Sequence, residues 1–361
     1  MAPAADRRSR RPVFHELTVA SVEPLCPDAV AVTFDVPEHL REDYAFTAGQ
    51  SLVLRRVVGG REERRSYSIS AAEGHPLRIG VREVPGGVFS AWLVHEVAAG
   101  RVVEVQTPTG RFGAGAGGGR HLGIAAGSGI TPVLSLAGTV LARDRTAHFT
   151  LVTVNRTGSS TMFAEDLGDL KNRYLSRLHH LQVLTRESRE AGLPSGRLDA
   201  ERLRHLLAEM VPLQGLDASW LCGPLGLVED ARRVLTELGV PPERVHSELF
   251  HVAEEPPARA APAVAGTPAG SSQVTVVLDG VSATVAVPRD APILDCARVL
   301  RADLPYSCRS GVCGTCRARV TEGEVAMRRN HALEPPDLER GFVLTCQSLP
   351  VTDRVTVDYD A

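Results

Sequence analysis

The sequence has no run of the roughly 20 apolar residues that a helix needs to cross a bilayer. Even residues 121–141 are interrupted by glycines, Thr131 and Pro132. Residues 1–12 carry four arginines, but no apolar run follows them, so a secretory signal is not expected. We expect a disordered N-terminal tail, no membrane association and a cytoplasmic location.

An excess of charge of either sign is also lacking. The net charge of −3, with 23% charged and 43% hydrophobic residues, is ordinary for a soluble globular protein and gives no global field that would attract nucleic acid. The 361 residues exceed the about 250–300 at which single hydrophobic cores stop growing, so two or three domains are expected.

Oxygen-activating centres are missing from the sequence as well. It contains no haem-binding cysteine context, no grouping of two histidines with one carboxylate, and no paired E-x-x-H helices. Any chemistry with oxygen is therefore expected to belong to a partner.

Composition divides the chain into three folded segments. Residues 253–272 are rich in proline and alanine without hydrophobic periodicity, which predicts an extended flexible linker. Residues 13–114 contain short alternating runs typical of an antiparallel β-barrel or sandwich. In residues 115–252 apolar strands alternate with helical stretches, which predicts an α/β domain with a parallel sheet. The glycine-rich run 113–119 is interpreted as a loop or hinge between these two domains.

The last segment, residues 273–361, has a different order. Two alternating strands flank a turn at 279–280, a helical pattern covers 292–304, and apolar strands are expected at 342–347 and 354–359. This order predicts a small sheet crossed by one helix.

Four of the seven cysteines crowd into the last 54 residues, which argues against a disulfide framework and for a metal or redox centre. Cys308, Cys313 and Cys316 follow the spacing C-x4-C-x2-C, and with the later Cys346 they form the plant-type arrangement of four thiolate ligands for a [2Fe–2S] cluster. A structural zinc site would use two short cysteine knuckles, and this segment has one.

The residues around these cysteines suit a loop wrapped around a cluster. Gly311 and Gly314 occur where backbone without side chains is required for close approach. From residue 305 to 348 the segment resembles plant-type ferredoxin domains, which implies a β-grasp ferredoxin-like fold and assigns the ligand role to the four cysteines. Cys26 and Cys296, outside this motif, are expected to be small buried apolar side chains.

A second group of motifs lies in the first domain. Arg65, Tyr67 and Ser68 form an R-x-Y-S pattern, in which the guanidinium suits a pyrophosphate, the phenol ring an isoalloxazine, and the hydroxyl its reactive nitrogen. Alone, this segment also fits an ordinary edge strand. A helix start that offers backbone amides to phosphate is expected further on, at Gly86, Gly87, Val88 and Ser90.

The second domain contains a strand, residues 124–126, that runs into a G-x-G-x-x-P turn. Its glycines permit a tight turn close to a pyrophosphate, and proline suits a first helical turn. Because the proline replaces the last glycine of the fingerprint G-x-G-x-x-G, a classical Rossmann dehydrogenase is disfavoured. The residues of this turn expected to bind the nucleotide are Gly127, Ser128, Gly129, Thr131 and Pro132.

Across residues 14–252 these motifs together resemble the ferredoxin–NADP reductase superfamily. The resemblance implies an FAD-binding β-barrel followed by an NAD(P)-binding domain. It places the segment Cys222-Gly223-Pro224 beside the nicotinamide ring, Phe250 near the flavin and Glu248 near the site of hydride transfer. Plain core positions remain alternative interpretations of Cys222 and Phe250. The expected catalytic residues are Ser68, Cys222 and Glu248.

The residues that follow the apolar strand 149–154 indicate the coenzyme preference. Asn155 and Arg156 follow this strand, with no acidic residue at the strand end that would bind a ribose 2′-hydroxyl, whereas Arg156 suits a 2′-phosphate. We predict NADPH rather than NADH. Arg186 is a weaker second candidate for the same role.

The nicotinamide, the flavin and the [2Fe–2S] cluster are expected to act in one electron-transfer chain. A nicotinamide gives up two electrons as hydride, whereas a [2Fe–2S] cluster accepts one at a time, so a flavin with an accessible one-electron state is the required converter. The expected order of flow is NADPH, FAD, [2Fe–2S], external acceptor. A flexible linker lets the cluster domain move between the flavin and a partner.

The module order resembles that of the reductase components of phenylacetyl-CoA epoxidases, a family within the multicomponent bacterial monooxygenases; segments 64–70, 86–92, 155–160, 246–250 and 327–348 carry this resemblance. It implies a di-iron oxygenase complex as the acceptor, in phenylacetate catabolism, and no nucleic-acid partner. Two alternatives stay open: the reductase of an aromatic-ring hydroxylating or other di-iron oxygenase, and a redox-sensing binding protein. Module order counts against the first and the intact nicotinamide turn against the second.

Overall fold

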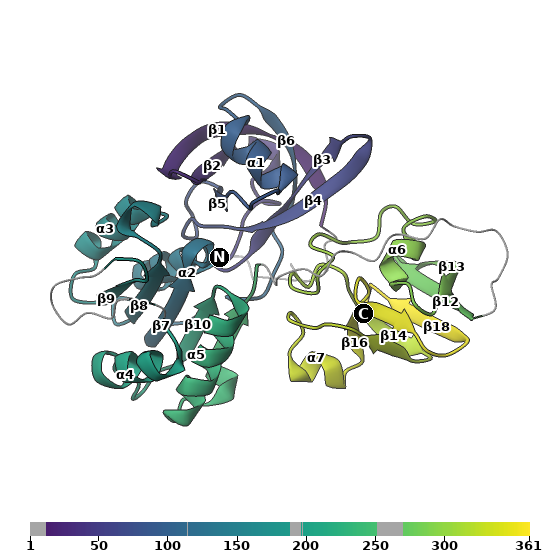
Figure 1. The fold of residues 1–361 in the computed structure, drawn as a ribbon. Helices are drawn as coiled ribbons and strands as arrows, with labels where there is room; N and C mark the ends of the chain where they lie inside the picture. The colour runs from purple at the N-terminus through teal and green to yellow at the C-terminus, as the bar shows by residue number, and fades with distance from the viewer. Residues whose placement is uncertain (1–11, 114, 188–195, 197, 251–269) are drawn as a thin grey trace, which may run out of the picture. The chain divides into compact units, whose positions relative to one another are not determined.

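The computed structural model describes residues 12–113, 115–187, 196, 198–250 and 270–361. The chain forms two compact units, Met1–Ser247 and Glu248–Ala361, and each is described by itself (Figure 1). None of the helices in these described ranges is long and apolar enough to cross a membrane.

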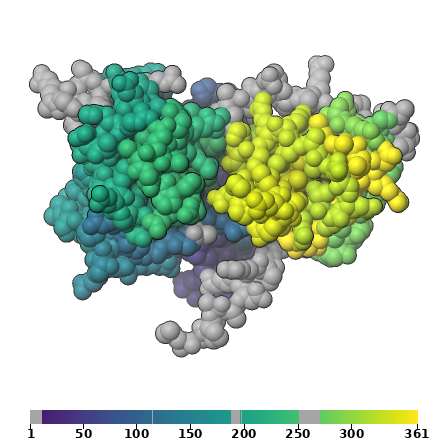
Figure 2. All heavy atoms as spheres, turned by 90° about the horizontal axis from the view of Figure 1, so that it is seen from below, coloured from purple at the N-terminus to yellow at the C-terminus, as the bar shows by residue number. Residues whose placement is uncertain are grey.

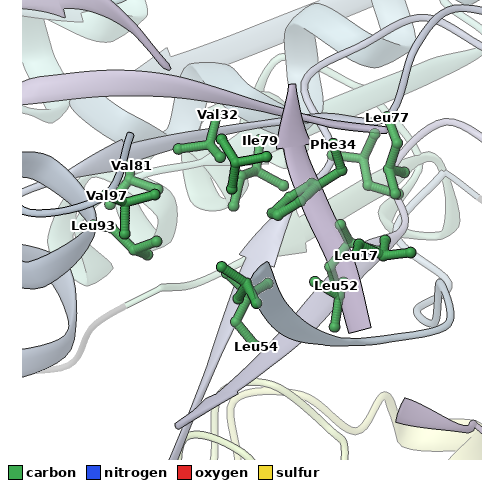
Figure 3. Packing of buried hydrophobic residues seen from close by; sticks show 14 of the residues in the cluster. Leu17, Val32, Phe34, Leu52, Leu54, Leu77, Ile79, Val81, Leu93 and Val97 are labelled. Atoms are coloured by element: carbon green, nitrogen blue, oxygen red, sulfur yellow. The ribbon is translucent and has the colours of Figure 1, made fainter. Parts of the chain in front are cut away.

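The first unit begins with a six-stranded antiparallel sheet in the order β4-β3-β6-β1-β2-β5. A bridge between Ile69 and Ile79 joins its two edges, so the sheet closes into the predicted barrel. Inward-facing side chains such as Leu17, Phe34 and Leu54 fill its centre (Figure 3). The elements are β1 Phe14–Cys26, β2 Ala29–Asp35, β3 Ser51–Val58, β4 Arg61–Ser68, β5 Arg78–Arg82, α1 Val88–His95 and β6 Val102–Gln106.

The second domain of this unit has a sheet in the order β11-β10-β7-β8-β9, in which β10, β7, β8 and β9 run parallel, as predicted. Helices α2 and α5 pack on its buried strands, and the side chains of α4 and α5 lie together on one face (Figure 2). The elements are β7 Arg120–Ala126, α2 Ile130–Arg143, β8 His148–Asn155, α3 Ala164–Arg173, β9 Leu178–Leu184, α4 Ala200–Met210, β10 Ala218–Cys222, α5 Leu225–Glu237 and β11 Val245–Glu248.

Polar contacts join these two domains. On α2, the hydroxyl of Ser135 donates to the backbone carbonyl of Ala71 at 2.6 Å. Arg78 of β5 forms an ion pair with Asp166 of α3 at 2.5 Å. The barrel and the parallel sheet therefore belong to one compact unit.

The second unit holds a five-stranded sheet in the order β13-β12-β18-β14-β16 and a separate pair, β15-β17. Strands β12 and β13 form the predicted hairpin, and β12 pairs in parallel with β18. Helix α6 packs on both hairpin strands, which confirms a small sheet crossed by a helix. The elements are β12 Ser271–Leu278, β13 Val281–Pro288, α6 Ile293–Ala297, β14 Arg317–Glu322, β15 Val325–Met327, α7 Pro335–Glu339, β16 Phe342–Leu344, β17 Ser348–Pro350 and β18 Arg354–Asp358.

Two elements of this unit are shorter than predicted. The helical pattern covers 292–304, but α6 ends at Ala297, and Val299 and Leu300 beyond it are 67% and 57% exposed, so no buried face supports further turns. Strand β16 ends at Leu344 instead of continuing to 347, because the chain turns at this point and takes Cys346 out of the sheet.

Candidate functional site

The four cysteines of the ferredoxin-like motif lie in two pairs. Three of them occupy the loop between α6 and β14, and Cys346 lies in the turn between β16 and β17. Hydrogen bonding with Cys313 lowers the pKa of the Cys308 thiol to about 5, and the same bond together with burial raises the pKa of Cys313. Hydrogen bonding with Cys346 likewise raises the pKa of Cys316. The side chains of 308 and 313, and those of 316 and 346, are thus direct neighbours.

The backbone of this loop takes conformations that side chains disfavour. Gly311 and Gly314 have φ of 82° and 69°, and a Cβ on Gly311 would lie 3.2 Å from the carbonyl oxygen of Arg329. The amide of Ser310 donates to the sulfur of Cys308 at 3.4 Å. Glycines therefore permit the tight wrapping, and an amide directed at sulfur stabilises a charged thiolate.

A second segment that sequence reasoning left without a role supports the loop. The amide of His331 donates to the Gly311 carbonyl at 3.0 Å, and the side chain of Gln347 donates to the Arg309 carbonyl at 2.8 Å. The side chain of Asn330 bonds the backbone at Ala332 and Leu333 and so fixes this segment. Residues 327–348 carry part of the resemblance to the family, but the sequence did not indicate that they support the cluster loop through hydrogen bonds.

The donor set fits a two-iron cluster. The Cys308–Cys313 and Cys316–Cys346 contacts provide two pairs of neighbouring thiols, which suits a cluster with two irons and four thiolate ligands. Cys308 and Cys313 would hold one iron, and Cys316 and Cys346 the other.

The R-x-Y-S residues lie on β4 of the barrel. Arg65 is exposed and pairs with Glu63 at 2.9 Å. The half-buried ring of Tyr67 lies 6.3 Å from that of Phe89, and burial raises the pKa of the phenol, which keeps it protonated. Ser68 is only 4% exposed. A surface guanidinium beside a partly buried aromatic ring suits a dinucleotide with a flat ring system.

Helix α1 begins directly after Gly87, as predicted. The hydroxyl of Ser90 accepts a hydrogen bond from the amide of Val84 at 3.0 Å and donates to the carbonyl of Gly87 at 3.2 Å, so its side chain fixes the turn. Gly86 and Val88 are exposed on either side. The first amides of a helix have no intrahelical partner, so this end offers donors to a phosphate.

The G-x-G-x-x-P turn connects β7 to α2. The buried Thr131 donates from its hydroxyl to the carbonyl of Ser128 at 2.9 Å, and Pro132 is buried in the first turn of the helix. These two residues shape the turn from within. The half-buried Gly127 and Ser128 are the members of the motif that reach the surface.

The two nicotinamide motifs touch each other. A Cβ on Gly129 would lie 2.2 Å from the carbonyl oxygen of Cys222, and one on Gly223 would lie 2.9 Å from the Cβ of Ala126. The side chain of Cys222 is buried in the domain core, and Pro224 precedes α5. The carboxyl ends of β7 and β10 therefore form one cradle of close-packed backbone, which suits a dinucleotide at the edge of a parallel sheet.

Two arginines lie at the next strand ends. Asn155 ends β8 and is buried, whereas Arg156 is exposed. The amide of Arg186 donates to the carbonyl of Arg156 at 2.8 Å, so the backbones of these two exposed residues are adjacent.

Glu248 ends β11, and Phe250 is 36% exposed. Proximity of Glu248 and Phe250 to a flavin stays a prediction.

The structure adds a basic residue that sequence reasoning missed. The Nη1 atom of Arg82, from β5 of the barrel, would lie 3.1 Å from a Cβ on Gly127. Arg82 also donates to Asp28 at 3.1 Å and to the carbonyl of Ser160. It brings positive charge to the nucleotide turn from the other domain, an approach that no local pattern in the sequence signals.

Comparisons with known proteins agree with the three domains. Residues 16–113 match the oxidoreductase FAD-binding domain, residues 124–233 the oxidoreductase NAD-binding domain, and residues 276–351 the 2Fe-2S iron-sulfur cluster binding domain. The chain is 41% identical over 354 residues to a subunit of the 1,2-phenylacetyl-CoA epoxidase of Escherichia coli (strain K12), and the match covers 96% of this chain and 98% of that protein.

A further relative and a solved structure match the chain over nearly its whole length. The ferredoxin reductase component of 3-ketosteroid-9-alpha-monooxygenase from Rhodococcus rhodochrous is 34% identical over 350 residues, covering 95% of this chain and 96% of that protein. Phthalate dioxygenase reductase, described as a modular structure for electron transfer from pyridine nucleotides to [2Fe–2S], has the same fold, with a TM-score of 0.59 at 23% identity over 96% of this chain and 98% of that one.

The three domains define the class of protein, an oxidoreductase with sites for FAD, a nicotinamide dinucleotide and a [2Fe–2S] cluster. The chain belongs to the family of ferredoxin reductase components that includes the matched subunit of phenylacetyl-CoA epoxidase. In this class electrons pass from the nicotinamide to the flavin and then singly to the cluster. The predicted family is confirmed.

Proposed function

We propose that the chain is the reductase component of a phenylacetyl-CoA epoxidase, which takes electrons from NADPH and delivers them to a di-iron oxygenase complex in phenylacetate degradation. The observation that supports this best is the 41% identity to the epoxidase subunit over nearly the full length of both chains. The proposal includes a cytoplasmic location and the domain boundaries 13–114, 115–252, 253–272 and 273–361.

The proposal assigns roles to the residues of the three sites. Ser68, Cys222 and Glu248 act at the site of hydride transfer, and the four cysteines hold the cluster. The residues that bind FAD are Arg65, Tyr67, Ser68, Gly86, Gly87, Val88, Ser90 and Phe250. The residues that bind the nicotinamide dinucleotide are Gly127, Ser128, Gly129, Thr131, Pro132, Asn155, Arg156, Cys222, Gly223 and Pro224.

An anaerobic titration with NADPH tests the relay. Flavin and cluster absorbance are followed together, and an electron paramagnetic resonance spectrum is recorded on the reduced protein. We expect both centres to bleach and a [2Fe–2S] signal to appear. Flavin reduction without that signal, in protein that contains iron, would contradict the roles of the four cysteines. Absence of flavin reduction would contradict the reductase function and favour a redox sensor.

The partner is tested by reconstitution. The reductase is mixed with a purified di-iron epoxidase complex, phenylacetyl-CoA, NADPH and oxygen, and epoxide is measured. A parallel reaction uses a 3-ketosteroid monooxygenase, because the reductase component of such a system is 34% identical. Epoxide formation supports the proposal, whereas turnover of the steroid alone would contradict it and indicate the reductase component of a 3-ketosteroid monooxygenase instead.

The preference for NADPH depends on Arg156, whose exposed guanidinium follows β8. We expect Arg156→Ala to lower the ratio of kcat/KM for NADPH over NADH by about tenfold, because a charge-assisted contact with the 2′-phosphate is lost. An unchanged ratio would remove the basis for this preference.

A further inference from the structure

One arginine from each domain, Arg82 of the barrel and Arg156 of the second domain, contacts the same carboxylate of the barrel. Asp28 lies in the turn between β1 and β2. Its Oδ1 accepts a hydrogen bond from Nε of Arg82 at 3.1 Å, and its Oδ2 lies 3.4 Å from Nη2 of Arg156. The carboxylate therefore reaches from the barrel to the side chain that the proposed function assigns to the 2′-phosphate.

The contacts of the two oxygens differ in strength. Oδ1 is held by Arg82 and by the thiol of Cys26, which donates to it at 3.2 Å, and Arg82 in turn donates to the Cys26 sulfur at 3.2 Å. Cys26 is thus half-buried in a polar contact, which corrects its prediction as a small buried apolar side chain. Arg156 makes the long contact and is 52% exposed, so it can leave Asp28 while Arg82 and Cys26 keep the carboxylate in place.

We propose that Asp28 is a specificity-determining residue for the coenzyme: it is the counter-ion of Arg156 in the nucleotide-free protein, and the 2′-phosphate of NADPH replaces it. Carboxylate and phosphate oxygens bind the same guanidinium donors and repel each other at such short range. NADH has no 2′-phosphate and does not compete for Arg156. Asp28 therefore weakens the binding of NADPH selectively. This inference rests on the proposed role of Arg156.

The test compares steady-state kinetics of the full-length protein with NADPH and NADH. In Asp28→Asn the competing charge is gone, and we expect the ratio of kcat/KM for NADPH over NADH to rise about two- to fivefold, as suits a partly exposed ion pair. The change should appear as a lower KM for NADPH, with the KM for NADH unaltered. An equal change for both coenzymes, or a fall in the ratio, would overturn the inference.

Two further variants separate the possible causes. Asp166→Asn removes another carboxylate that pairs across the same two domains, with Arg78, and should leave the ratio unchanged. In the Arg156→Ala background, Asp28→Asn should no longer alter the ratio. If Arg156→Ala by itself has no effect, the proposed 2′-phosphate site fails. If Arg156→Ala lowers the ratio but Asp28→Asn does not raise it, only the role of Asp28 fails.

Discussion

His121 is a buried histidine at the start of the second domain, and its ring lies nearly parallel to those of Phe149 and Trp220, with centroid distances of 5.9 and 6.3 Å. Its Nδ1 accepts a hydrogen bond from the indole of Trp220 at 3.2 Å. Its Nε2 lies 3.1 and 3.3 Å from the carbonyls of Gly117 and Gly118 and is therefore the nitrogen that carries the proton. A neutral ring thus ties the glycine-rich loop between the two domains to the sheet.

Stability should depend on pH through this residue. Burial lowers the pKa of His121 below its ordinary value of 6.5. The unfolded chain takes up a proton below about pH 6.5 while the folded ring does not, so the free energy of unfolding falls as the pH drops below 6.5, by up to about 1.4 kcal/mol per pH unit. Urea unfolding from pH 5 to 8, followed by tryptophan fluorescence, measures this slope.

Variants separate His121 from the other histidines. His121→Gln should be less stable at pH 8 but show a shallower loss of stability toward pH 5 than the parent protein. His148→Gln, at an exposed position of the same domain, should keep the parent slope. A parent-like slope in His121→Gln would show that other groups carry the acid sensitivity.

At the scale of elements, the loop between α6 and β14 supplies three of the four motif cysteines, and the turn after β16 supplies the fourth. Cys346→Ser removes one of the four thiols, and we expect it to abolish the [2Fe–2S] paramagnetic signal and most bound iron. Because the flavin domain belongs to the other compact unit, NADPH should still bleach the flavin at a rate within about twofold of the parent. Iron analysis, paramagnetic resonance and stopped-flow absorbance check the three expectations.

Cys296 supplies the matched control for this variant. It is a half-buried cysteine on α6 of the same unit, outside the C-x4-C-x2-C motif. Cys296→Ser should retain the cluster signal and iron content. Equal loss in both variants would mean that the signal reports the folding of the unit and not ligation by Cys346.

The sequence predicted those elements whose position depends on a local apolar pattern, and it failed where the position depends on distant contacts. Strands such as β7 and β8 were predictable because both faces are buried and the apolar run is local. The end of α6 was not, because Val299 and Leu300 continue the helical pattern although both are more than half exposed. At the candidate site, contiguous motifs were readable, whereas Arg82 and Asp28 act across two domains, a proximity that only the fold creates.

At the scale of the whole first unit, the barrel and the parallel sheet meet at a glycine of β5. A Cβ on Gly80 would lie 2.6 Å from the ring of Phe163 and 2.7 Å from the side chain of Thr131, both in the second domain. Phe163 has a φ of 58° and is almost fully buried, so it has little freedom to yield. The absence of a side chain at residue 80 allows the nucleotide turn to approach the barrel.

Gly80→Ala should therefore disturb the packing of the barrel against the second domain. We expect a loss of about 1–3 kcal/mol in stability through overpacking, and a fall of at least about tenfold in the rate of flavin reduction by NADPH, with FAD still bound. Thermal unfolding and stopped-flow flavin absorbance measure the two effects. Gly168→Ala is the matched control, because a Cβ there, on α3, meets nothing within 4 Å. If both alanine variants reduce the flavin at the parent rate, close contact at Gly80 does not set the distance between the two nucleotide sites.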